Sequence, residues 1–134
     1  MAERDAVLFA NDVFYRAFAD GDVSAMDALW SSEAPVSCIH PGWGAILDRE
    51  EIIASWSAIL SDDNAPDIRC QDADAQIYGD VAVVICFETM GDGSLIATNV
   101  FCREGRIWKM VHHQAGPTSA LPDPLADDIR RPLH

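Results

Sequence analysis

The sequence predicts an α+β domain in which helices cover one face of a curved antiparallel sheet. Between residues 5 and 60, apolar residues recur at intervals of three and four, which is the period of a helix. From residue 67 the apolar residues alternate with others at a period of two, as in strands. Short glycine-containing turns separate these later segments, a pattern typical of hairpins. The 134 residues fit a single domain.

Three helices are expected in the first half of the chain. They cover residues 5–20, 24–30 and 49–60. Gly21 can take the left-handed conformation that often ends a helix. Ser24 is expected to cap the second helix and Asp48 the third, because short oxygen-bearing side chains accept hydrogen bonds from the first free N–H groups.

Five strands are expected, and all but the first follow the third helix. They lie near residues 36–40, 67–78, 81–90, 94–103 and 106–114. Four prolines occur from residue 117 onward, and the apolar period is lost there. We therefore expect a domain over residues 1–116 and a proline-containing tail over 117–134.

The composition excludes several classes of function. Twenty-two acidic residues against nine basic ones give a net charge of −13, which disfavours binding to nucleic acid or to a lipid surface. The longest apolar run, residues 81–87, is far shorter than the roughly 20 residues that span a membrane. The first residues lack the pattern of a signal peptide, so a cytoplasmic location is expected.

The cysteines indicate neither a disulfide framework nor a metal site. They are Cys38, Cys70, Cys86 and Cys102, and no two of them form a CxxC pair. Free thiols in a reducing compartment are expected, with no bound metal and no cofactor.

Two-residue hairpins would define the two faces of the sheet. In that register Glu88, Ala97 and His112 lie side by side on the inner face, with Asn99 one pleat further along. The outer face keeps several large apolar residues, which are Val83, Ile85, Phe87, Val100 and Val111. An exposed apolar sheet usually marks a contact surface, so a homodimer is expected.

Glu88 and His112 are the candidate acid–base pair. Across Ala97 their backbones would be about 10 Å apart, close enough for the side chains to meet. A carboxylate beside an imidazole could raise the histidine pKa and serve in proton transfer. Glu88 could instead form a purely structural bridge to Arg49 or to His112.

Aromatic and polar residues around this pair are candidate ligand contacts. Asn99 could orient a ligand, and Phe101 with Trp108 would form an inward cross-strand pair that is typical of a core and could also border a ligand. His40 could be a further acid–base group, or could hold the turn before Pro41. The remaining candidates are Trp43, as a lid or a plug, and Trp56, for which core packing is favoured over ligand contact.

Several segments resemble the SnoaL-like branch of the nuclear-transport-factor-2-like superfamily. The resemblance covers residues 5–116 and is carried by the segments 38–43 (Cys-Ile-His-Pro-Gly-Trp), 48–49, 55–56, 97–101 and 108–113, together with Ile59. It implies a cone-shaped half-barrel, three helices wrapped by a bent antiparallel sheet, an internal pocket and a sheet-to-sheet dimer. The superfamily includes cyclases, isomerases, dehydratases, transport factors and an association domain of protein kinases, so the fold alone does not select an activity.

Two functions therefore stay open. The first is a pocket for a small hydrophobic molecule, with cofactor-free isomerisation, cyclisation or dehydration as its chemistry. The second is a non-catalytic ligand-binding or dimeric assembly module with an interior filled by aromatic side chains. A continuous cavity of roughly 300 Å³ or more would favour the first.

Overall fold

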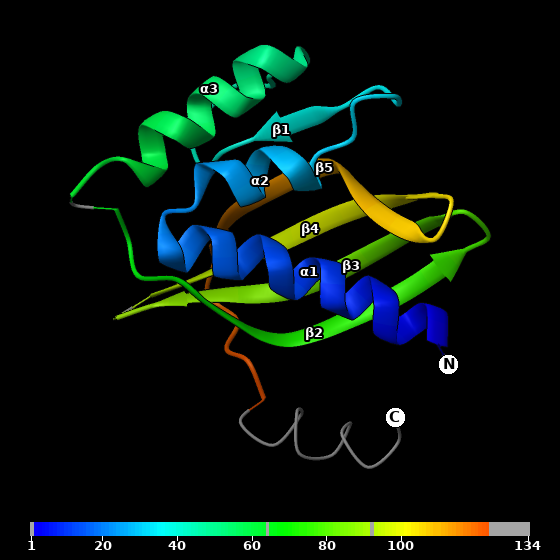
Figure 1. The fold of residues 1–134 in the computed structure, drawn as a ribbon. Coiled ribbons are helices and arrows are strands. Elements are labelled where there is room, and N and C mark those ends of the chain that lie inside the picture. The colour runs from blue at the N-terminus through cyan, green and yellow to red at the C-terminus, as the bar shows by residue number, and fades with distance from the viewer. Residues whose placement is uncertain (1, 64, 92, 124–134) are drawn as a thin grey trace.

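The predicted α+β fold is confirmed by a computed structural model, which describes residues 2–63, 65–91 and 93–123 (Figure 1). Its helices are α1 (Ala2–Asp20), α2 (Val23–Leu29) and α3 (Arg49–Leu60). Its strands are β1 (Ser37–Ile39), β2 (Arg69–Tyr78), β3 (Val81–Met90), β4 (Gly93–Glu104) and β5 (Ile107–Thr118). Figure 1 shows α1 lying across one face of the long strands, with α2 next to it and α3 beyond α2, near β1.

The five strands form one open, mixed sheet in the order β1-β5-β4-β3-β2. The four long strands pair antiparallel, as predicted. The short β1 pairs parallel to β5, so the sheet is not purely antiparallel. A parallel neighbour requires a crossover connection, and the chain supplies one through α3 and β2–β4.

Of the three residues predicted to end or cap a helix, two are confirmed. Asp48 accepts a hydrogen bond from the Glu51 N–H at 3.1 Å, as predicted. Gly21 has a φ of +63°, as the expected left-handed helix end requires. The cap of α2 is Asp22 rather than Ser24, because the Asp22 carboxylate accepts a hydrogen bond from the Ala25 N–H at 3.0 Å.

The register of β3 and β4 differs from the predicted one by two residues. Met90 pairs with Gly93, and Glu88 therefore faces Leu95 rather than Ala97. A shift of two residues preserves which side chains share a face, because the side-chain period of a strand is two. The predicted inner face of β3 and β4 is accordingly correct.

A β-bulge in β5 exchanges the faces of the sheet on which the side chains of His112 and His113 lie. Phe101 pairs with Met110 and Val100 with His112, which leaves Val111 as an extra residue. The extra residue turns His113 to the inner face, where it pairs with Asn99 and is buried. The prediction that His112 faces inward is wrong. His112 lies on the other face and hydrogen-bonds the Ser37 hydroxyl at 2.7 Å.

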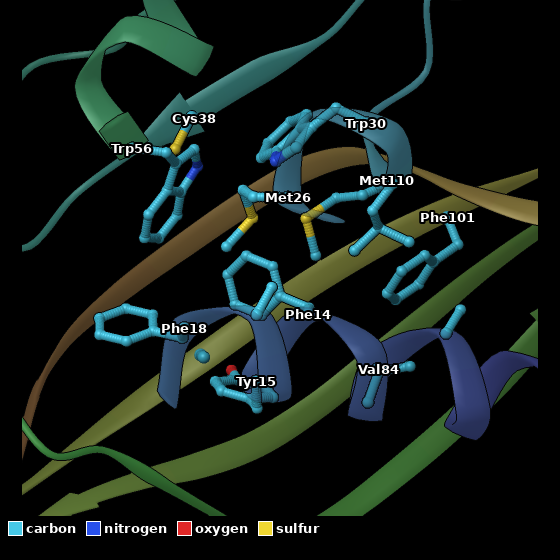
Figure 2. Close-up of a cluster of buried hydrophobic side chains, with 14 of the residues drawn as sticks. Phe14, Tyr15, Phe18, Met26, Trp30, Cys38, Trp56, Val84, Phe101 and Met110 are labelled. Atoms are coloured by element: carbon cyan, nitrogen blue, oxygen red, sulfur yellow. The ribbon is translucent and has the colours of Figure 1, made fainter. Parts of the chain in front are cut away.

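The core fills the space between the helices and the inner face of the sheet (Figure 2). Its largest fully buried side chains include Phe14, Met26, Trp30, Trp56 and Phe101. Phe14 of α1 packs edge-on against Trp56 of α3, with ring centroids 5.3 Å apart. α1 and α3, separated by about thirty residues of chain, thus meet over the sheet.

The C-terminal end of β5 reaches beyond the predicted domain boundary. Residues 116–118 continue the strand and pair with residues 94–96 of β4. The part of the predicted tail over residues 124–134 lies outside the described residues. In the described part of the chain, no helix is long and apolar enough to cross a membrane.

Candidate functional site

A pocket of about 340 Å³ opens at one end of the helix-covered face of the sheet. Its walls are mainly apolar and aromatic, and three titratable side chains reach it. The lining residues are Phe18, His40, Pro41, Trp43, Trp56, Ile59, Pro66, Ile68, Glu88, Met90, Leu95 and His113. The volume lies within the range of small-molecule sites.

Hydrogen bonds set the tautomer of His113. Its Nδ1 lies 2.6 Å from Oδ1 of Asn99, an atom that can only accept. The Asn99 amide orientation follows from its donor hydrogens, which it gives to Asn11 Oδ1 at 2.9 Å and to the Tyr15 hydroxyl at 3.1 Å. His113 Nδ1 therefore carries a proton, and in the neutral ring Nε2 holds the free lone pair.

Glu88 is held by a tyrosine from the helix above it. The Tyr15 hydroxyl donates to Glu88 Oε2 at 2.7 Å, and both side chains are buried. Tyr15 also accepts a hydrogen bond from Asn99, so one buried network joins Glu88 to His113. Such a network holds both titratable groups in defined orientations.

Burial favours the neutral forms of both groups. It raises the pKa of Glu88, against an opposing effect of the Tyr15 hydrogen bond. It lowers the pKa of His113 to about 3, with smaller contributions from His40 and His112. Glu88 Oε2 and His113 Nε2 are 3.9 Å apart, too far for a hydrogen bond that would favour an ion pair. The prediction that Glu88 raises the pKa of His112 is wrong, because His112 lies on the opposite face of the sheet and burial lowers its pKa.

His40 and two tryptophans form the outer wall of the pocket. His40 Nε2 lies 2.8 Å from the Ser55 hydroxyl, which donates its own hydrogen to the Ile52 carbonyl, so His40 is the donor. Burial lowers the pKa of His40 to about 4. The ring lies between the indoles of Trp43 and Trp56, with centroid distances of 4.8 and 4.7 Å. Trp43 is 52% exposed and lies at the pocket mouth, while Trp56 is 1% exposed.

The structure brings together half of the predicted site. Glu88, His40, Trp43 and Trp56 all line the pocket. Their chemical roles stay predictions. The structural alternative for Glu88, a bridge to Arg49 or to His112, is wrong. Arg49 pairs with Asp27 at 2.9 Å, and His112 lies on the other face of the sheet.

Four predicted site residues lie outside the pocket. His112 is on the opposite face of the sheet because of the bulge at Val111. Asn99 is fully buried behind His113 and already donates to Asn11 and Tyr15, which leaves no amide hydrogen for a ligand. Phe101 belongs to the buried core, and Trp108 borders a different groove, beside α1 and α2.

Sequence reasoning missed two members of the network, Asn11 and Tyr15. They are four residues apart in α1, and both lie on its buried face. Two hydrogen-bonding side chains at helical spacing within an apolar stripe were the available signal, since buried polar groups need partners. That signal would have pointed to a polar network below α1.

The fold and this pocket define a class of small α+β domains with an internal cavity. The family of SnoaL-like domains matches residues 7–119. The chain belongs to this family.

Solved structures agree with this assignment. A candidate dehydratase of the NTF2-like family from Streptomyces avermitilis is 30% identical, with a TM-score of 0.80 over 89% of this chain and 98% of that one. A candidate association domain of a calcium/calmodulin-dependent protein kinase type II from Thiobacillus denitrificans is also 30% identical, with a TM-score of 0.70 over 82% and 93% of the two chains. An NTF2-like protein of unknown function from Pseudomonas putida is 16% identical, with a TM-score of 0.76 over 91% and 95%. Among curated proteins, no sequence matches this chain.

Proposed function

We propose that the pocket binds a small hydrophobic carbonyl compound and catalyses cofactor-free elimination of water from it. One observation carries the proposal: an imidazole with a free Nε2 and a carboxyl with a raised pKa lie 3.9 Å apart in an apolar pocket. Concerted proton transfer needs a base and an acid at the same site, and burial favours the neutral form of each group here. The similarity to the candidate dehydratase supports this choice among the activities of the fold.

The proposed reaction starts from a β-hydroxy carbonyl compound. His113 Nε2 removes the proton on the carbon next to the carbonyl group, and that C–H electron pair becomes the new C=C bond. The C–O bond to the hydroxyl group breaks as protonated Glu88 gives its proton to the departing oxygen, which leaves as water. His113 becomes cationic and Glu88 anionic in this step.

The pair then returns to its starting state without a cofactor. The proton moves from His113 to Glu88, because burial favours the neutral form of both groups. Asn99 and Tyr15 are positioning residues in this scheme. Asn99 keeps the Nδ1–H tautomer of His113, and Tyr15 holds the Glu88 carboxyl in place.

A β-hydroxy ketone with an aromatic group, 4-hydroxy-4-phenylbutan-2-one, tests the proposal. Its dehydration gives a conjugated enone that can be followed by ultraviolet absorbance. We expect catalysis by the wild-type chain and a loss of about 10²–10⁴-fold in kcat/KM for His113→Asn, the range for removal of a general base. Glu88→Gln keeps the shape, removes the titratable proton and should also lose most activity.

The control is His112→Asn, the same substitution at the neighbouring residue on the outer face. It should keep wild-type activity. Equal losses for His112→Asn and His113→Asn would contradict the assignment of the base. Failure of the wild-type chain both to turn over the hydroxy ketone and to bind the enone product would refute the proposed substrate class.

A second candidate function is assembly through the outer face of the sheet. Two aliphatic side chains there, Ile85 and Ile96, are each 38% exposed on neighbouring strands. Val83, Phe87, Val100 and Val111 of the predicted contact are partly buried. The similarity to the candidate kinase association domain supports this reading, and a homodimer through this face does not exclude the pocket.

Ile85→Lys tests this interface. A lysine in the centre of an apolar contact must be desolvated, so we expect monomers or insoluble protein where the wild-type chain runs as a dimer. Sedimentation and light scattering at micromolar concentration measure the change. Ala19→Lys, at an exposed position of α1, should leave the dimer intact. A monomeric wild-type chain would refute the interface.

A further inference from the structure

A second, larger groove lies at the other end of the helix-covered face. It has a volume of about 480 Å³ and runs between α1, α2 and the turn that joins β4 to β5, three elements that Figure 1 shows close together. Its walls are formed by Ala6, Phe9, Ala10, Val13, Ala25, Ala28, Leu29, Arg106, Ile107, Trp108 and Lys109. None of these residues lines the pocket around His113.

The apolar floor of the groove is open to solvent. Four alanines from the two helices line the groove with small side chains, and Trp108, which is 4% exposed, also lines it. Phe9 and Ile107 stand at its edges and are 62% and 60% exposed. Large apolar side chains exposed together indicate a surface that an apolar molecule covers.

The charge of the groove is opposite to that of the chain. The chain carries 22 acidic and nine basic residues, yet the described lining contains two basic residues and no acidic one. Arg106 makes no side-chain hydrogen bond or ion pair with any residue that the structure describes. The Lys109 ammonium is held at the rim by the Ala28 carbonyl at 2.6 Å and keeps further N–H donors.

We propose that this groove binds an amphipathic anion: a free monocarboxylate with an unbranched, medium-length hydrocarbon chain. The hydrocarbon chain of the ligand would lie along the four alanines, against Trp108 and between Phe9 and Ile107. The carboxylate would take charge-assisted hydrogen bonds from the guanidinium of Arg106 and from the ammonium of Lys109. A neutral ligand would leave this cationic rim unused. The inference does not depend on the proposed chemistry of the His113 pocket.

Decanoate and decan-1-ol, which differ in the charged end, are the probes. We follow both by two-dimensional NMR, using the Trp108 indole and the His113 backbone as reporters of the two cavities. We expect decanoate to shift the Trp108 signal and to bind at least about tenfold more tightly than decan-1-ol, as charge-assisted hydrogen bonds imply. Arg106→Glu should remove this preference and leave the affinity for decan-1-ol unchanged.

Two further variants separate charge from shape. Arg69→Glu makes the same charge change at another arginine without a side-chain partner among the described residues, on β2 and outside the groove, and should leave decanoate binding as in the wild type. Ala28→Leu, at an exposed helical position, partly fills the groove and should weaken the binding of both decanoate and decan-1-ol.

Three results would overturn the proposal. One is an absence of decanoate binding at millimolar concentration, and another is an unchanged decanoate affinity in Arg106→Glu. The third is a shift confined to His113, which would place the ligand in the other pocket. Binding to vesicles of anionic phospholipid without binding of decanoate would identify a membrane surface instead, and would equally refute a free carboxylate as ligand.

Discussion

Replacing Trp56 by alanine is expected to lower the free energy of unfolding by about 3–5 kcal/mol, the range for truncation of a buried aromatic side chain. The ring is 1% exposed and packs edge-on against Phe14 and Phe18, at centroid distances of 5.3 and 5.5 Å. It also supports His40 at 4.7 Å. Its removal leaves a cavity where α1, α3 and the pocket wall meet. Urea denaturation followed by circular dichroism measures the loss.

Trp43→Ala is the matched control for this prediction. Trp43 also contacts His40, at 4.8 Å, but it is 52% exposed and lies at the pocket mouth. We expect a loss of no more than about 1 kcal/mol, because most of its apolar area already faces water. Ligand affinity should fall in both variants, since both rings line the pocket. Equal losses of stability would contradict the different burial of the two rings.

Acid is expected to unfold the protein through its buried histidines. The pKa of His113 falls from about 6.5 in the unfolded chain to about 3 in the folded one, so between these values the unfolded chain binds more protons. Stability is then fully present above about pH 6.5 and is lost as the pH falls toward 3. At 1.36 kcal/mol per pKa unit, the loss reaches on the order of 3 kcal/mol near pH 4.

Two other groups near His113 also affect how the free energy of unfolding changes with pH. His40, with a pKa lowered to about 4 by burial, adds to the acid loss. The raised pKa of Glu88 acts in the opposite direction, because it favours the folded state at low pH and is lost as the pH rises through the folded value.

His113→Asn tests the histidine contribution. The asparagine amide can still donate to Asn99. For each protein we take the difference between its free energies of unfolding at pH 7 and at pH 4. This difference should be smaller in His113→Asn than in the wild type. His112→Asn provides the comparison. The pKa of His112 is also lowered by burial, but this residue lies on the outer face, is less buried and should contribute less to the slope. An unchanged slope in His113→Asn would contradict a neutral buried imidazole.

The two proposed sites differ in the chemistry that they offer a ligand. The pocket around His113 holds a base and an acid in an apolar environment and is therefore suited to proton transfer. The groove beside Trp108 holds two cations over an apolar floor, and its described lining contains neither a histidine nor a carboxylate. It is suited to binding without reaction. A medium-chain carboxylate in that groove would touch α1 and α2, and α1 also carries Tyr15, which donates a hydrogen bond to Glu88.

Periodicity alone determined the element order, the class of fold and most of the inner face of the sheet. The helical stripe over residues 5–20 and the period-two segments from residue 67 are local patterns, and each element follows them because its apolar side must be buried. The same reasoning placed Glu88 on the inner face. The predicted β3–β4 register was wrong by two residues, but a shift of two leaves each side chain on the same face of the sheet.

Only the tertiary structure decided which histidine belongs to the site. One extra residue at Val111 reverses the parity of the following strand, and it lies where the edge of β5 changes partners from Trp30 to β1. No local pattern in the sequence signals that change, because it depends on segments some eighty residues apart in the chain. The tautomer of His113 likewise depends on Asn99 and, through it, on Asn11 and Tyr15 of α1. These contacts exist only after the helix has packed on the sheet.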